Sequence, residues 1–215
     1  MGFFITFEGI EGCGKTTQLR RLAADLQADG HAVLLTREPG GCAIADTLRQ
    51  VLLDSANHAM APATELLLYA AARAQHVAEV IGPALDAGKI VLCDRFIDAT
   101  LAYQGYGRGL DLGLIKELNR IATGSVTPDL TLLFDFSPAE GLTRARRRNA
   151  GSSGPDEGRF EAESLAFHQR VRQGYLDLAT RDARFRVIDA NGDEETVAGR
   201  VRATLAPLLA LRSPK

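Results

Sequence analysis

The feature that most constrains this chain is a phosphate-binding loop that directly follows its first apolar segment. Residues 9–16 read Gly-Ile-Glu-Gly-Cys-Gly-Lys-Thr and match the pattern G-x-x-x-x-G-K-[ST] in full. An apolar, aromatic and β-branched stretch at 2–7 predicts a buried strand before the loop, and leucines at helical spacing predict a helix over 16–29. Strand, loop and helix stand in the order that this motif requires. The sequence therefore predicts a site for the phosphates of a nucleoside triphosphate.

The residue types in the loop explain this chemistry. Its glycines let the backbone turn tightly and bring N–H groups against phosphate oxygens, and the following helix adds its positive end. Lys15 can reach the outer phosphates, and the Thr16 hydroxyl can bind Mg²⁺. We predict that the donor nucleotide is bound by Gly9, Ile10, Glu11, Gly12, Cys13, Gly14, Lys15, Thr16 and Thr17.

Length and composition favour one ordinary globular domain over 1–215, because 215 residues suffice for a sizeable α/β domain and are few for two. A net charge of −2 gives no sign of a nucleic-acid surface or a membrane face, and no apolar run approaches the length of a membrane span. Since the first strand begins at once, we expect no signal peptide. Three cysteines without metal-ligand spacing favour a reduced, cytoplasmic setting.

Strand-like and helix-like segments alternate along the rest of the chain. Short, mostly apolar runs predict four more strands, at 32–36, 90–93, 130–134 and 185–188. Helical periodicity predicts helices at 44–53, 63–86, 112–122, 138–148, 162–181 and 195–209, the last with a kink or early end at Pro207. This alternation predicts an α/β fold of three layers, the P-loop NTPase fold, with a five-stranded parallel sheet flanked by helices. Ligands of such sheets bind at the carboxyl ends of the strands.

Asp94 and Arg95 directly follow the predicted strand at 90–93. A carboxylate at the end of a strand beside the phosphate loop commonly holds Mg²⁺, directly or through water. The neighbouring guanidinium can form a forked contact with phosphate oxygens. The alternative is a buried structural ion pair.

Two further groups of residues suit a small polar ligand. Tyr69 and Arg73 lie one helical turn apart, so that the ring could stack on a nucleobase while the guanidinium hydrogen-bonds its edge. A partly buried aromatic beside a surface arginine is the alternative, and we expect His76 on the same face to be structural. Residues 98–109 add a hydroxyl, an amide, aromatics and glycines that let the chain bend; an ordinary Gly-rich surface loop fits them equally well.

A segment at 149–158 is polar and flexible in composition and predicts a mobile surface loop. Arginines flank it at Arg144, Arg146, Arg147, Arg148 and Arg159. One interpretation is a solvated helix end with a connector; the other is an Arg-rich lid over 144–160 that closes on polyphosphate. The phosphate-binding loop favours the lid, because phosphoryl transfer needs positive charge and the exclusion of water.

These motifs together resemble those of the bacterial thymidylate kinases, P-loop nucleoside monophosphate kinases that phosphorylate dTMP with ATP. The matching blocks lie between residues 7 and 135, at 7–17, 36–41, 69–76, 94–96, 102–105 and 129–135. Many kinases share the phosphate loop and the Asp-Arg pair, whereas the Arg-Glu-Pro-Gly-Gly and Tyr-Gln-Gly blocks are much more specific. The chain departs from the family pattern at Tyr69, Phe96 and Cys13, where phenylalanine, tyrosine and alanine are usual.

The resemblance implies a role for each site residue. Tyr69 would stack on thymine, Arg73 would hydrogen-bond the base, and Arg95 would hold the 5′-phosphate. Glu11 would face the 3′-hydroxyl. The implied dTMP-binding set is Glu11, Glu38, Tyr69, Arg73, Arg95, Thr100, Tyr103 and Gln104. The implied catalytic set is Lys15, Arg95, Arg148 and Arg159, with Thr16 and Asp94 as Mg²⁺ ligands.

The resemblance also implies a homodimer, and a lid that supplies the arginine that the phosphate loop lacks. The predicted reaction is in-line transfer of the γ-phosphoryl group of ATP to dTMP, which gives dTDP for dTTP synthesis. Two alternatives remain. Another small-molecule P-loop kinase, such as a deoxynucleoside kinase, would favour a carboxylate base, which Glu8 or Glu11 could provide. A non-enzymatic nucleotide-binding switch would have no acceptor and would hydrolyse its nucleotide slowly.

Overall fold

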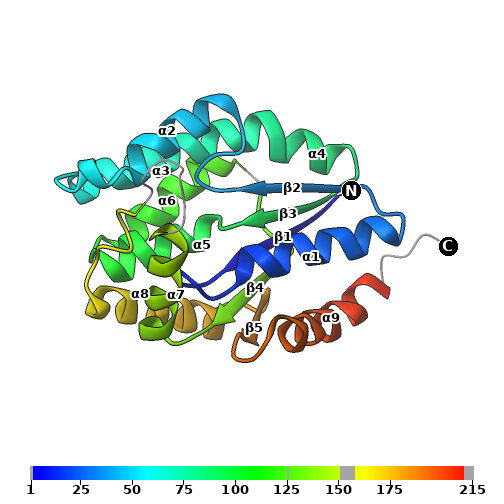
Figure 1. Ribbon diagram of the computed structural model, residues 1–215. Coiled ribbons are helices and arrows are strands. Elements are labelled where there is room, and N and C mark those ends of the chain that lie inside the picture. Colours follow the sequence, from blue (N-terminus) through cyan, green and yellow to red (C-terminus); the bar gives the residue numbers. More distant parts are fainter. Residues whose placement is uncertain (1, 125, 151–157, 211–215) are drawn as a thin grey trace.

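A parallel sheet of five strands forms the centre of the molecule (Figure 1). The computed structural model describes residues 2–124, 126–150 and 158–210. The strands are β1 (Phe3–Glu8), β2 (Val33–Arg37), β3 (Ile90–Asp94), β4 (Leu130–Asp135) and β5 (Phe185–Asp189). Their order is β2-β3-β1-β4-β5, and each neighbouring pair is parallel. The α/β class and the five-stranded parallel sheet predicted from the sequence are confirmed.

Helices cover both faces of this sheet (Figure 1). They are α1 (Lys15–Ala28), α2 (Ala43–Leu53), η1 (Ser55–Asn57), α3 (Pro62–His76), η2 (Val77–Ile81), α4 (Gly82–Asp86), α5 (Ile97–Thr100), η3 (Leu101–Gly107), α6 (Leu112–Thr123), α7 (Pro138–Ala150), α8 (Leu165–Arg181) and α9 (Glu194–Ala210). The helix predicted over 63–86 contains a wider π turn, η2, between α3 and α4. Pro207 lies inside α9, which continues beyond it rather than ending early.

Strand β1 is buried along its whole length and feeds two hydrophobic clusters. Side chains alternate between the faces of a strand. Ile5 accordingly packs in a cluster with Leu22 of α1, while Phe4 packs in another with Ile81 of η2. A strand that is apolar on both faces has no solvent-exposed side. It therefore occupies the centre of the sheet, where the phosphate loop that follows it meets the ends of β3 and β4.

The segment after Arg95 is helical, which corrects the interpretation of 98–109 as a Gly-rich bend. Helix α5 runs on into the π-helical η3, and η3 packs closely against α8. A Cβ atom at Gly107 would lie 2.6 Å from the ring of Phe167, and one at Gly174 would lie 2.5 Å from the ring of Tyr106. These glycines allow two helices to approach each other. They do not serve a turn.

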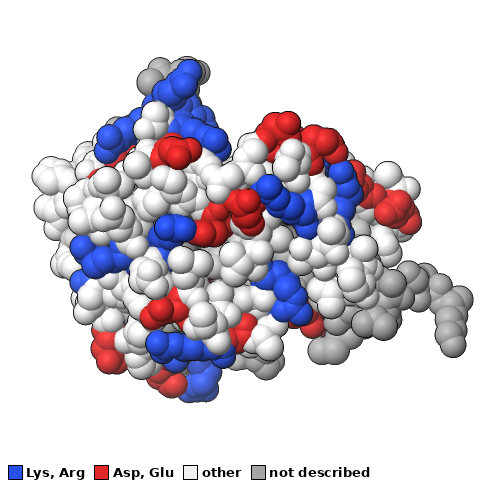
Figure 2. Space-filling view, turned by 90° about the horizontal axis from the view of Figure 1, so that it is seen from below, with Lys and Arg blue, Asp and Glu red and all other residues white. Residues whose placement is uncertain are grey.

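Acidic and basic side chains are interspersed over the face shown in Figure 2, with a basic cluster at its upper edge where α7 lies. Helix α7 carries four exposed arginines, Arg144, Arg146, Arg147 and Arg148. Across the described ranges, no helix is both long and apolar enough to cross a membrane.

Candidate active site

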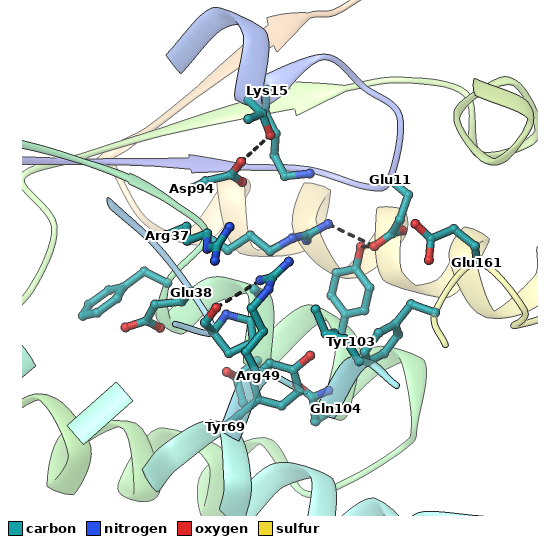
Figure 3. A pocket seen from close by; sticks show the side chains of 18 of the residues that line it. Glu11, Lys15, Arg37, Glu38, Arg49, Tyr69, Asp94, Tyr103, Gln104 and Glu161 are labelled. Atoms are coloured by element: carbon teal, nitrogen blue, oxygen red, sulfur yellow. Dashed lines mark hydrogen bonds and ion pairs between the residues drawn. The ribbon is translucent and has the colours of Figure 1, made fainter. Parts of the chain in front are cut away.

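One cavity of about 520 Å³ opens at the carboxyl ends of the strands (Figure 3). It brings together side chains from the phosphate loop, the β2–α2 connection, α3, the end of β3, α5, η3 and α7. The predicted site residues that line it are Glu11, Gly12, Lys15, Thr16, Glu38, Tyr69, Arg73, Asp94, Arg95, Thr100, Tyr103, Gln104 and Arg148. Predicted residues that stand outside its lining are Gly9, Ile10, Cys13, Gly14, Thr17 and Arg159.

The phosphate loop is held in shape by its own glycines and by α7. Gly12 has φ +69, and a Cβ atom there would lie 2.1 Å from the carbonyl oxygen of Gly141. Lys15 is nearly buried and donates from Nζ to the carbonyl oxygen of Ile10 at 3.2 Å. These contacts fix the shape of the loop and place its cation at the cavity.

Thr16 and Asp94 lie in direct contact, because β1 and β3 are neighbours in the sheet. The hydroxyl of Thr16 donates to Oδ2 of Asp94. The two oxygen-bearing groups predicted as Mg²⁺ ligands thus meet at one point of the cavity wall. Asp94 does not pair with its neighbour Arg95, so the interpretation of 94–95 as a structural ion pair is wrong.

Arg95 turns back from the end of β3 toward the phosphate loop. Its backbone is left-handed, with φ 70, and its N–H donates to the carbonyl oxygen of Phe7 at 3.0 Å. The guanidinium lies over the ring of Tyr103 and donates to Glu11 Oε1 at 3.0 Å and to the Tyr175 hydroxyl at 3.2 Å. This places a cation where the phosphate loop meets the rest of the cavity.

Glu11 is held as an anion by its neighbours. Besides Arg95, the Tyr103 hydroxyl donates to Oε1 at 2.5 Å, and Nδ1 of His168 lies 3.2 Å from Oε2. Burial alone would raise the pKa of Glu11, but the nearby Arg95 guanidinium and His168 hold that pKa well below its usual value. A carboxylate so strongly paired is a poor general base.

Tyr69 and Arg73 line the far end of the cavity from α3. Arg73 is fully buried, which excludes the alternative of a surface arginine. Its three nitrogens donate to Glu38 Oε2 at 2.7 Å, Asn119 Oδ1 at 2.7 Å and the Phe96 carbonyl oxygen at 3.0 Å. His76 is also buried, between Glu38 and Thr36, as a structural histidine.

Helices α5 and η3 add Thr100, Tyr103 and Gln104 to the cavity. The Thr100 hydroxyl is buried and has no hydrogen-bond partner among the residues described. A buried hydroxyl without a partner costs free energy, so its position favours a partner supplied by a ligand.

Two cavity cations were missed by the sequence analysis, Arg37 and Arg49. Arg37 belongs to the Arg-Glu-Pro-Gly-Gly block, which was the available signal, while Arg49 stands in α2 without a recognisable motif.

The two predicted lid arginines differ in their surroundings. Arg148, near the end of α7, has a 66% exposed side chain, lines the cavity and lies 3.5 Å from Glu161. Arg159 is buried and donates to Glu65 Oε2 at 2.6 Å and to the Leu52 carbonyl oxygen at 2.5 Å. Of the predicted mobile loop 149–158, residues 151–157 lie outside the described residues.

A phosphate-binding loop at the end of the central strand and a cation facing it across one cavity define a P-loop phosphotransferase. Comparison with known proteins narrows this class. The family model described as thymidylate kinase matches residues 7–201. The thymidylate kinase of Syntrophotalea carbinolica is 63% identical over 212 residues, which cover 98% of both chains. That of Geobacter sulfurreducens is 60% identical over 206 residues, or 95% of this chain and 97% of the relative.

A solved structure agrees with these relatives. The crystal structure of thymidylate kinase from Ehrlichia chaffeensis matches with a TM-score of 0.75 and 36% identity, covering 95% of this chain and 98% of the other. The chain belongs to the thymidylate kinase family.

Glu8 gives a prediction about stability. It is fully buried at the end of β1, where burial and, less strongly, the Asp98 carboxylate raise its pKa from 4.5 to about 8. The folded chain therefore binds this proton more tightly than the unfolded chain, so the free energy of unfolding falls as the pH rises from 4.5 to about 8. Glu8→Gln should remove this contribution, so wild type loses stability relative to the variant across that range. Urea unfolding at several pH values measures the difference.

The control is Glu117→Gln, which changes an exposed glutamate on α6 whose pKa is lowered by Arg120. A lowered pKa changes the free energy of unfolding only at pH values below 4.5. The stability of Glu117→Gln should therefore follow the same pH dependence as wild type between pH 4.5 and about 8. Parallel curves for Glu8→Gln and wild type would contradict the protonated, buried Glu8.

Proposed function

We propose that the cavity holds dTMP with its 5′-phosphate at Arg95 and its base at Tyr69 and Arg73. As a member of the thymidylate kinase family, the chain is an ATP:dTMP phosphotransferase that transfers the γ-phosphoryl group to dTMP and yields dTDP. One observation carries the assignment of the acceptor. A single cavity extends from Lys15 of the phosphate loop to the ring and guanidinium on α3, with Arg95 in its wall.

Arg95 would receive the acceptor phosphate. Its guanidinium has five N–H donors, of which the protein uses two, for Glu11 and Tyr175. The remaining donors can form a forked contact with phosphate oxygens. Since the nucleophile is itself a phosphate oxygen, the reaction needs no strong general base. Lys15, Arg95 and Arg148 would instead neutralise the charge of the transferred group.

The base would lie against the Tyr69 ring. Three acceptors fix the Arg73 guanidinium, and its remaining N–H donors can hydrogen-bond the edge of the base. The Thr100 hydroxyl and the Gln104 amide would complete the polar contacts.

Thr16 and Asp94 would hold Mg²⁺. A hydroxyl and a carboxylate are hard oxygen donors, and here they already touch. Within the described ranges, no cluster of three or more His, Cys, Asp or Glu side chains could hold a metal ion. This fits Mg²⁺, which commonly takes one or two protein ligands and completes its shell with water and nucleotide phosphates. When bound, the ion would neutralise charge on the donor phosphates.

The deoxynucleoside kinase alternative fits these surroundings less well. Its base would be Glu8, which stands outside the cavity lining, or Glu11, which is held by Arg95 and Tyr103.

We also propose a cytoplasmic homodimer. Exposed apolar side chains on α3 and α6, Leu67, Leu114 and Ile121, support a surface that a second copy covers.

The first prediction on the reaction concerns Arg95. Arg95→Ala should raise the KM for dTMP on the order of ten- to a hundredfold, because it removes charge-assisted hydrogen bonds to the acceptor. The KM for ATP should stay nearly constant. Arg120→Ala, on an exposed pair of α6, is the control and should leave both constants unchanged. An increase confined to the KM for ATP would show that Arg95 serves the donor.

A second prediction separates the two lid arginines. Arg148→Ala should lower kcat more than it raises the KM for dTMP, because its charge would act on the transferred group. Arg147→Ala, one residue away on the same helix and outside the cavity lining, should keep kcat. Arg159→Ala should destabilise the fold by about 3–5 kcal/mol, since it removes one partner of a buried ion pair. Full kcat in Arg148→Ala would exclude it from catalysis, and kcat of folded Arg159→Ala tests the predicted catalytic role of that residue.

A further inference from the structure

A buried carboxylate, Glu65, lies behind the base end of the cavity. It belongs to the first turn of α3, is fully buried and stands outside the cavity lining. Three side chains donate to it. Gln104 Nε2 lies 2.7 Å from Oε1, Arg159 Nη1 lies 2.6 Å from Oε2, and Arg108 reaches both oxygens at 3.3 and 3.2 Å.

The contact with Gln104 fixes which way its amide points. Burial would raise the pKa of Glu65, but hydrogen bonds from Arg108 and Gln104 and the arginine charges lower it overall. An ionised carboxylate only accepts hydrogen bonds, so Gln104 must turn its NH₂ group toward Glu65. The amide oxygen, at the other end of the same planar group, receives no hydrogen bond from the residues described. Gln104 lines the cavity (Figure 3), so a ligand bound there can supply the donor for this oxygen.

We propose that Glu65 is a positioning residue that holds the Gln104 amide with its oxygen toward the acceptor base, and so selects bases that carry an N–H donor at the ring nitrogen. This inference rests on the proposed placement of the base at Tyr69 and Arg73. Thymine has such a donor at N3, whereas cytosine has a lone pair there. A fixed acceptor oxygen therefore gains a hydrogen bond with thymine and faces a second lone pair with cytosine.

A merely structural role of Glu65 would act differently. Through Arg159 the same carboxylate also anchors the segment that carries Phe160, a cavity residue whose ring packs edge-on against Tyr103 at 5.4 Å. Loss of that anchor should weaken dTMP and dCMP alike. The informative quantity is therefore the ratio of kcat/KM for dTMP to kcat/KM for dCMP, which general loosening does not move.

The test is Glu65→Gln. A glutamine there can present either an oxygen or an NH₂ group to Gln104, so the amide is no longer fixed. We expect the dTMP/dCMP ratio to fall by about tenfold or more, as for the loss of an oriented hydrogen bond, with the KM for ATP unchanged. Glu163→Gln is the matched control, because it removes the other carboxylate on Arg108 and leaves Gln104 untouched. It should keep the ratio.

Two further variants keep the test decisive. Glu65→Asp retains the charge for both arginines but withdraws the carboxylate by about 1.5 Å, so it should fold and still lower the ratio. In a Gln104→Leu background, Glu65→Gln should change the ratio no further, because there is no amide to orient. An unchanged ratio in folded Glu65→Gln and Glu65→Asp overturns the inference. Wild type without activity on dTMP would instead refute the proposed function.

Discussion

The arrangement of the site depends on one buried carboxyl group, that of Glu8, at the end of the central strand. Oε1 accepts the N–H of Phe96 at 2.8 Å, and Oε2 accepts the hydroxyl of Tyr175 at 2.7 Å. These bonds join β1, the segment after β3 and α8 at one point. They stabilise the left-handed turn at Arg95, which an L-residue adopts only when its surroundings enforce it. The guanidinium thereby reaches Glu11 and the cavity.

Ion pairs between arginines and glutamates stabilise the same arrangement elsewhere in the cavity. Arg95 is paired with Glu11, and Arg73 with Glu38. Paired side chains lose little further freedom when a ligand binds, and they keep the fold from burying uncompensated charge. The same logic explains Glu65, which balances Arg159 while it orients Gln104. The site is therefore preorganised by carboxylates that need not touch substrate.

The sequence predicted the parts that local patterns determine, and it missed the parts that only long-range contacts create. The parallel sheet and the family were predicted because the apolar runs and the motif from Gly9 to Thr16 carry local signals, and both predictions were confirmed. The helical path of 97–107 was missed, because Gly105 serves close packing on α6 and Gly107 serves close packing on α8. Burial of Arg159 was missed as well, since its partner Glu65 lies 94 residues away in the chain.

We propose that Arg95, held in place through Glu8, receives the phosphate of a nucleotide acceptor. The most direct test compares dTMP with thymidine, which differs by that phosphate alone, in assays of ADP release with product identification. We expect dTDP from dTMP and no phosphorylation of thymidine, because the 5′-hydroxyl of thymidine would need a general base and thymidine carries no phosphate for Arg95. Comparable phosphorylation of thymidine, or ADP release that is independent of acceptor, would contradict the role of Arg95 as the acceptor-phosphate site.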